Sequence, residues 1–180
     1  MATYISILRG INVIGKKLIR MSDLKKSYEK LNFSDVVTYI QSGNVLFQYK
    51  TEKTEVLENL IYNRIKTDFN MKVSVIVLTL EKLNKIIKSN PFKDDPSKDK
   101  SFLHVTFLKG APEKFNRQSI TEKINGEEEI DFTSAAVYLY CPHGYGKSKL
   151  NNNFLENKLK VTATTRNWKT TIKLQELAKN

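Results

Sequence analysis

Along the first 78 residues, segments with the hydrophobic pattern of strands alternate with segments that have the pattern of helices. Four segments are predicted strands: 3–8 alternates and is β-rich, 36–41 and 45–49 flank a tight hairpin connection, and 72–78 is almost continuously apolar. Two segments place apolar residues three or four positions apart, as amphipathic helices do: 21–31 and 57–65. Ser22 stands near the start of the first helix, where it could act as its N-cap. The pattern therefore predicts the order β-α-β-β-α-β.

The same order is predicted a second time further along the chain. Thr79 is expected to cap a linking helix that ends before Asn90-Pro91, and the loop-like stretch KDDPSKDK at 93–100 follows it. Strands are then predicted at 102–108, 128–132, 136–141 and, briefly, 161–163. Helices are predicted at 112–118 and 150–159, and a last helix begins with the sequence TTRNW at 164–168.

This repeated order predicts an α+β fold made of two ferredoxin-like (β-α-β-β-α-β) subdomains with an extra C-terminal helix. The chain should break within 89–101. Residues 1–88 would form the first subdomain with the linking helix, and residues 89–180 the second. The halves share no obvious sequence identity, so the predicted duplication is one of element order.

Composition excludes several classes of protein. No apolar run approaches the 18 or more residues of a membrane helix, and the N-terminus lacks the basic region and cleavage site of a signal peptide. A single cysteine, Cys141, excludes an internal disulfide framework, and two histidines leave little for a metal site. We therefore expect a cytoplasmic monomer with no cofactor, no metal and no membrane partner.

The net charge of +11 is unevenly distributed. Residues 1–30 carry a net charge of +5 and residues 143–180 a net charge of +6, while residues 31–142 are neutral. Twenty-five of the thirty basic residues are lysines, which a biased genome can produce without functional need. The concentration of charge at both ends nevertheless favours anionic partners such as phosphates, nucleotides or nucleic acid.

The expected topology gathers polar loops at sheet edges. In the first subdomain, 9–12 follows the first strand and 41–44 joins the second strand to the third, so both should lie at one edge. In the second subdomain, 143–149 and 164–168 should share the opposite edge. We expect these loops to border one basic cleft between the subdomains, although ordinary turn chemistry also accounts for Ser42-Gly43-Asn44.

Gly146-Lys147-Ser148 lies between a predicted strand and a predicted helix, as a phosphate-binding loop does. The complete pattern requires a glycine five residues before Gly146, where Cys141 stands, and a parallel sheet, which is not expected. A looser interpretation remains, in which Lys147, Lys149 and the amides at the start of the next helix hold an anion.

An RNA-recognition domain has the same element order. Its third strand carries stacking aromatic residues in a pattern that 42–46 lacks at four of five positions. For acid–base chemistry, His104 and His143 are the candidates. A half-buried, hydrogen-bonded strand histidine is the favoured interpretation of His104, and His143 is expected to be exposed. Neither Ser42 nor Ser148 has a histidine nearby in sequence to activate it.

The stretch TTRNWKT holds the only tryptophan of the chain. As a helix it would align Arg166, Lys169 and Lys173 in one cationic row and bury Trp168 on the opposite side. Like charges at i, i+4 repel on a bare helix, so such a row favours an anion docked against it.

Several strings occur together here: LRGINV, TYIQSGNV, NPF, a His-Val pair in the following strand, YGKSKL and TTRNWKT. In this combination the chain resembles the bacterial family catalogued as domain of unknown function 1697. The resemblance implies an α+β fold with two related subdomains, and no reaction. It implies a polar signature at Arg9, Gly10, Asn12, Gln41, Ser42, Gly43, Asn44, Ser148, Arg166, Asn167 and Trp168. Ile14 departs from the family, which usually has glycine there.

The favoured function is binding of a small anionic ligand, a nucleotide or a sugar phosphate. Cations would neutralise its charge: Arg9, Lys149, Arg166 and Lys173. Amides would orient it: Asn12, Gln41, Asn44 and Asn167. Gly10, Ser42, Ser148 and Trp168 complete the predicted site. The alternative is a nucleic-acid-binding module that uses the lysine-rich ends, and a third interpretation has these loops purely structural. No reaction is assigned.

Overall fold

The computed structural model describes Met1–Lys179, and the chain divides into two compact units. The first unit comprises Met1–Asn84 together with the chain from Leu174 onward, and the second comprises Lys85–Lys173. The sequence placed the boundary between residues 88 and 89. The observed division falls inside two helices, α3 (Leu80–Lys88) and α6 (Trp168–Lys179).

The first unit contains a four-stranded antiparallel sheet. Its elements are β1 (Ala2–Leu8), α1 (Met21–Glu29), β2 (Ser34–Tyr39), β3 (Asn44–Tyr49), α2 (Thr54–Phe69) and β4 (Val75–Thr79). The strand order is β2-β3-β1-β4, and every neighbouring pair is antiparallel. The predicted element order is confirmed for this unit.

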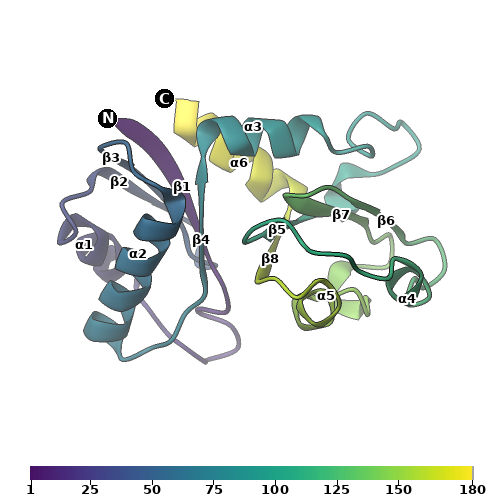
Figure 1. The fold of residues 1–180 in the computed structure, drawn as a ribbon, viewed down its shortest axis with the longest axis horizontal. Helices are drawn as coiled ribbons and strands as arrows, with labels where there is room; N and C mark the ends of the chain where they lie inside the picture. Colours follow the sequence, from purple (N-terminus) through teal and green to yellow (C-terminus); the bar gives the residue numbers. More distant parts are fainter. Residues whose placement is uncertain (180) are drawn as a thin grey trace. The chain divides into compact units, whose positions relative to one another are not determined.

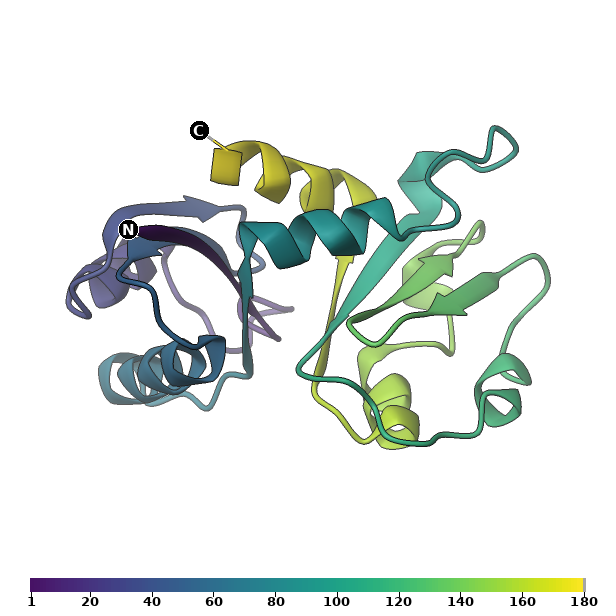
Figure 2. The same cartoon turned by 45° about the horizontal axis from the view of Figure 1, so that its top comes forward.

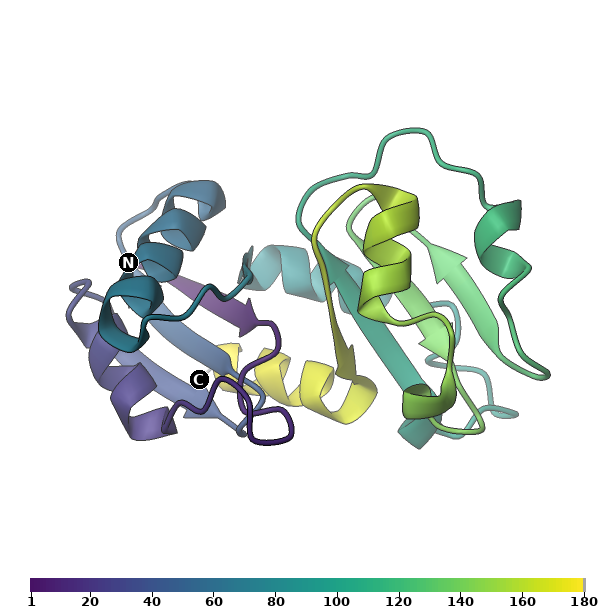
Figure 3. The ribbon, with the colours of Figure 1, turned by 90° about the horizontal axis from the view of Figure 1, so that it is seen from below.

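Helices α1 and α2 cover one face of this sheet (Figures 1 and 3). Alternate residues of a strand point to the same face, so Tyr4 and Leu8 of β1 enter the core with Leu24 of α1 and Ile61 of α2. The Tyr28 hydroxyl forms a 2.7 Å hydrogen bond with Ser6, which satisfies two buried polar groups.

Helix α2 also reaches β4 at the edge of the sheet. The Glu58 carboxylate accepts a 2.9 Å hydrogen bond from the backbone N–H of Val77, and Glu58 itself is buried. Because β4 is the last strand in the order β2-β3-β1-β4, this N–H lies on the side without a neighbouring strand. A helix side chain thus takes the place of a ladder partner.

The second unit holds another four-stranded antiparallel sheet, in the order β6-β7-β5-β8. Its elements are 3-10 helix η1 (Lys100–Phe102), β5 (Leu103–Leu108), α4 (Gln118–Thr121), β6 (Glu129–Phe132), β7 (Ala136–Tyr140), 3-10 helix η2 (Tyr145–Lys147), α5 (Asn152–Leu159) and β8 (Ala163–Asn167). Helices α4 and α5 lie on the same face of the sheet (Figure 2). Ile120 and Leu155 pack there against Leu139 and Ala163.

Three local predictions were wrong. The predicted helix at 112–118 is absent, and α4 begins only at Gln118. This stretch begins with Pro112 and offers only Phe115 as a large apolar side chain, so it has no apolar face to bury. Ser22 is not a cap, because Arg20 is the N-cap residue of α1 and no side chain caps the helix.

The third error concerns TTRNW, which is strand up to Asn167 and helix only from Trp168. Thr164 and Thr165 pair with Phe107 and Thr106 of β5, where β-branched residues pack well. Arg166 is therefore not part of a helical row with Lys169 and Lys173. By contrast, the Thr79 cap is confirmed, because its hydroxyl accepts a 3.1 Å hydrogen bond from the Lys82 N–H.

Within Met1–Lys179, none of the helices combines the length and the apolar character needed to cross a membrane.

Candidate functional site

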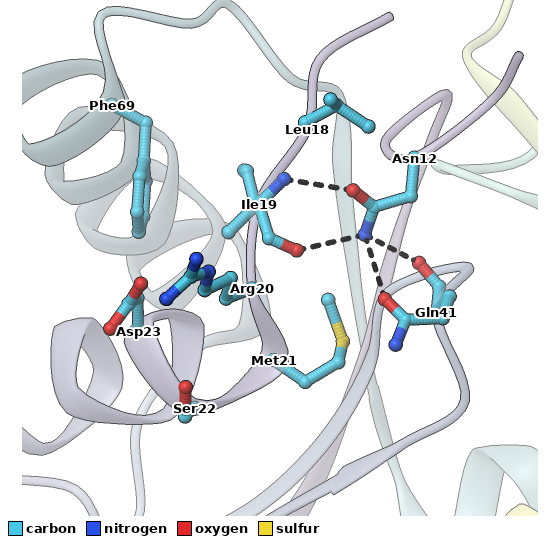
Figure 4. Close-up of a pocket in the computed structure, with 9 residues that line it drawn as sticks. All are labelled: Asn12, Leu18, Ile19, Arg20, Met21, Ser22, Asp23, Gln41 and Phe69. Carbon is cyan, nitrogen blue, oxygen red and sulfur yellow. Dashed lines mark hydrogen bonds between the residues drawn. The ribbon is translucent and has the colours of Figure 1, made fainter. Parts of the chain in front are cut away.

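The two polar loops of the first unit meet, as the topology predicted. The Asn12 side-chain amide donates 2.9 Å hydrogen bonds to the backbone oxygens of Ile19 and Gln41 (Figure 4). Its oxygen accepts a 2.8 Å hydrogen bond from the Ile19 N–H. We call this arrangement the Asn12 clamp. Because the Asn12 side-chain amide is hydrogen-bonded to both loops, we assign Asn12 the role of holding the loops in position.

The hairpin 41–44 is held by its own side chains. Asn44 is buried, and its amide donates 3.1 Å hydrogen bonds to the Tyr39 carbonyl and the Ser42 hydroxyl. Gly43 has a left-handed φ of +82°, and its carbonyl accepts a 2.8 Å hydrogen bond from the Leu8 N–H. A β-carbon on Gly43 would lie only 2.7 Å from Cδ1 of Ile11. Turn chemistry therefore accounts for Gly43 and Asn44.

A pocket of about 730 Å³ lies beside the Asn12 clamp. Its lining residues are Asn12, Leu18, Ile19, Arg20, Met21, Ser22, Asp23, Gln41 and Phe69. Figure 4 shows the amide of Gln41 on one side and Arg20, Asp23 and Phe69 on the other. Two residues predicted for the site, Asn12 and Gln41, thus share a real cavity.

Arg20 is the cation of this pocket, and it is not among the residues predicted for the site from the sequence. Its side chain is exposed, and among the described residues it forms no ion pair, not even with Asp23 in the same pocket. Its signal was the excess positive charge of residues 1–30. Arg9 and Gly10 belong to the same loop but do not line the pocket. The backbone N–H of Arg9 donates a 3.0 Å hydrogen bond to Ser74.

The predicted anion loop of the second unit uses its polar groups internally. Ser148 is buried, and its hydroxyl accepts a 3.1 Å hydrogen bond from the Leu150 N–H. Asn151 caps α5 by accepting a 3.1 Å hydrogen bond from Phe154. Lys149 is exposed. The start of α5 therefore offers fewer free amides to an anion than the sequence suggested.

The residues around the end of β8 differ in burial. Burial lowers the pKa of the half-buried Arg166 guanidinium to about 10, and its Nη1 donates a 3.0 Å hydrogen bond to the Thr165 carbonyl. Asn167 caps α6, accepting a 2.8 Å hydrogen bond from the Thr170 N–H. Trp168 is only 7% exposed, which confirms its predicted burial, and Lys173 is half-buried.

A hydrogen-bonded chain lies beside His104 in the second unit. The His104 ring stacks on Tyr145 with centroids 4.9 Å apart, and its Nδ1 lies 3.2 Å from the Phe102 carbonyl. The Tyr145 hydroxyl donates to Thr165 at 3.1 Å, and Thr165 donates to Asn152 at 2.7 Å. Burial lowers the pKa of His104. This agrees with a half-buried, hydrogen-bonded strand histidine.

Cys141 is buried, and the acidic and histidine side chains of the described residues form no metal centre. Burial raises the pKa of the Cys141 thiol to about 11, so little reactive thiolate is present at neutral pH. Among residues 1–179, no three His, Cys, Asp or Glu side chains are grouped so that they could hold a metal ion.

Fold and site together define an α+β protein with two four-stranded antiparallel sheets and a polar pocket beside the first. The chain belongs to the family described as "Protein of unknown function (DUF1697)", whose model matches residues 1–138. A solved conserved bacterial protein from Streptococcus pneumoniae is 22% identical, with a TM-score of 0.70 over 98% of each chain. That likeness concerns the fold. No curated protein matches the chain.

Proposed function

We propose that this protein binds a phosphorylated sugar or a nucleotide in the pocket beside the Asn12 clamp. The observation that carries the proposal is the lining: Arg20, Asp23 and Gln41 present a cation, a carboxylate and an amide to one cavity. Its volume of about 730 Å³ is in the range of small-molecule sites in proteins.

Each lining group suits one part of such a ligand. A guanidinium makes paired hydrogen bonds to phosphate oxygens, a geometry that lysine cannot reproduce, so Arg20 would take the phosphate. The Asp23 carboxylate only accepts hydrogen bonds, so it would take sugar hydroxyls. Leu18, Met21 and Phe69 would cover the apolar face of a base or sugar. Asn12 would keep Ile19 and Gln41 in place.

The second unit offers a separate candidate contact at Arg166. Arg166 is half-buried near the end of β8, and a guanidinium can form paired hydrogen bonds with phosphate oxygens. We therefore keep Arg166, with Asn167 and Lys173, as proposed anion contacts. The experiment tests this arginine independently of Arg20.

Thermal shift and calorimetric titration with inorganic phosphate, a hexose phosphate and mononucleotides test the proposal. Arg20→Gln should weaken binding of the best ligand at least tenfold, about 1.4 kcal/mol, because it removes a charge-assisted contact. Lys26→Gln is the matched control, since Lys26 is an exposed cation of α1 that does not line the pocket. Equal loss with Arg166→Gln alone would move the site to the second unit.

Nucleic-acid binding is the competing outcome of the same experiment. A polymer that follows the basic ends would bind with an affinity that falls by several decades as salt rises, because many phosphate contacts release counterions. Binding of a short oligonucleotide that is steep in salt and unaffected by Arg20→Gln, together with no mononucleotide binding, would contradict the pocket proposal.

We also propose that the two units derive from a ferredoxin-like duplication. Both sheets are antiparallel, and the strand orders β2-β3-β1-β4 and β6-β7-β5-β8 are equivalent. In each unit the two helices cover a single face. These correspondences support a common ancestor more strongly than element order alone does.

A further inference from the structure

The loop between β1 and α1 contains a miniature hairpin. Val13 and Lys16 form an antiparallel bridge, and the Lys16 N–H donates a 3.0 Å hydrogen bond to the Val13 carbonyl. The two residues at its tip, Ile14 and Gly15, have left-handed φ values of +45° and +70°. Positive φ at both central positions is typical of a type I′ turn, which favours asparagine and glycine. We call residues 13–16 the tip hairpin.

The tip hairpin is fastened at its base. The Asn12 N–H donates a 3.1 Å hydrogen bond to the Lys17 carbonyl, and the Lys17 ammonium donates a 2.8 Å hydrogen bond to the Lys72 carbonyl. The Asn12 clamp holds Ile19 immediately beyond. Figure 3 shows this dark purple segment folding back on itself between β1 and α1. Hydrogen bonds at its base therefore hold the tip hairpin in a defined conformation.

Large apolar side chains at and beside the tip hairpin are exposed to solvent. The Ile14 side chain is 94% exposed, Leu18 is 65% exposed and Val13 is 52% exposed. An isoleucine contributes nothing to the core from this position, and its β-branched side chain is disfavoured at a positive φ. Ile14 thus adds strain without adding burial, which points to a role in contact with another molecule.

Cations flank this apolar tip along the chain. Residues 9–20 contain Arg9, Lys16, Lys17 and Arg20 and no acidic residue, and all of these cations except Arg9 are exposed. A neutral apolar surface would gain little from these cations, and a charged surface without an apolar layer would gain little from the exposed Ile14. An anionic surface with an apolar layer beneath its charges complements both features at once.

We propose that the tip hairpin docks on an anionic lipid bilayer. Ile14 and Val13 enter the interfacial layer, while the exposed Lys16 and Lys17 beside them contact lipid phosphates, the arrangement that amphipathic membrane-binding segments use. Single-stranded nucleic acid fits less well, because its bases stack on aromatic side chains and residues 9–20 contain none. This surface attachment requires no membrane-spanning helix, and it does not depend on the proposed pocket function.

Co-sedimentation of the full chain with vesicles tests the inference. Vesicles of phosphatidylcholine with 30% phosphatidylglycerol should bind the protein, and vesicles of phosphatidylcholine alone should bind it at least tenfold more weakly. Ile14→Asn should reduce binding to the anionic vesicles at least tenfold, because a polar amide replaces the inserted side chain. Val56→Asn is the matched control, since Val56 is 40% exposed on α2 and should leave binding unchanged.

Ile14→Asn also separates docking from folding. Asparagine accepts left-handed φ values better than isoleucine, so this variant should unfold at a higher urea midpoint than the original chain while losing vesicle binding. It should still bind any soluble ligand of the pocket. Anionic-vesicle binding that is equal in both proteins, or absent from both, would overturn the inference. So would sedimentation showing that Ile14→Asn dissociates a dimer, or oligonucleotide binding that requires Ile14.

Discussion

At the scale of a single residue, protonation of the His104 ring should make the stability of the protein depend on pH. Burial lowers its pKa below the ordinary value of about 6.5, so the unfolded chain takes up this proton before the folded chain does. The free energy of unfolding should therefore decrease as pH falls through about 6.5, by at most about 1.4 kcal/mol per pH unit. Above pH 7 both states are neutral at this ring, and the effect disappears.

Urea denaturation between pH 5 and pH 7.5 checks this expectation, and an NMR titration of the ring checks its pKa. His104→Gln should flatten the pH dependence in this range. His143→Gln, in an exposed loop of the same unit, keeps His104 and should keep the dependence. An unchanged slope in His104→Gln would show that another group is responsible.

At the scale of elements, the junction of β1 with the β2–β3 hairpin depends on a missing side chain. Gly43→Ala would force a residue into a φ of +82° and place its β-carbon 2.9 Å from Cβ of Leu8 and still closer to Ile11. Strain and overpacking together should destabilise the protein by about 2 kcal/mol or more. A fall in the urea midpoint measures this loss.

Two other glycines serve as controls for that substitution. Gly10 also has a positive φ, of +70°, but a β-carbon there would meet nothing within 4 Å. Gly10→Ala should therefore cost only the conformational strain, about 1 kcal/mol. Gly146 has open space and no left-handed φ, so Gly146→Ala should change stability by less than about 0.5 kcal/mol. Equal effects at all three positions would exclude the steric argument.

Hydrophobic periodicity was sufficient to predict the elements that bury one regular face. It was insufficient where the pairing partner determines whether a segment is strand or helix. The strands around Phe47 and Leu139 and the helix around Ile61 could be predicted, because their apolar spacing is visible in the sequence. Thr164 and Thr165 suit a strand or a helix start equally until β5 supplies a ladder. Such positions are settled by tertiary pairing, which the local sequence does not contain.

The candidate site shows the same limit at the scale of the molecule. Topology alone predicted that the loops carrying Asn12 and Gln41 would meet, since both follow from strand direction. Topology could not show that the Asn12 amide would be hydrogen-bonded to neighbouring backbone oxygens. It also could not show that Arg20 would line the cavity instead of Arg9. Those outcomes depend on the path of the loop, which left-handed residues such as Asn12 and Ile14 determine.

The division of the chain predicts how the whole molecule unfolds. Helices α3 and α6 each contribute residues to both units, and helical hydrogen bonds connect residues four apart. Loss of one unit should therefore fray a helix that the other unit needs, so we expect one cooperative transition. Fluorescence of Trp168, which lies in the second unit, should follow the same urea curve as far-UV circular dichroism.

Gly43→Ala tests whether destabilising the first unit also destabilises the second, because Gly43 belongs to the first unit and Trp168 to the second. With coupled units, the substitution should lower the midpoint reported by Trp168 as much as the midpoint reported by circular dichroism. A Trp168 midpoint that stays unchanged would show that the units unfold independently.

The Glu58 carboxylate on β4 has a consequence for behaviour at high concentration. An edge strand with open N–H groups is a template on which another chain can add a strand, and this is a common first step toward aggregation. At Val77 the N–H is already bound by a buried carboxylate from α2. An incoming strand that paired with this N–H would first have to displace the buried carboxylate. The helix thus hinders the addition of another strand at this position of β4.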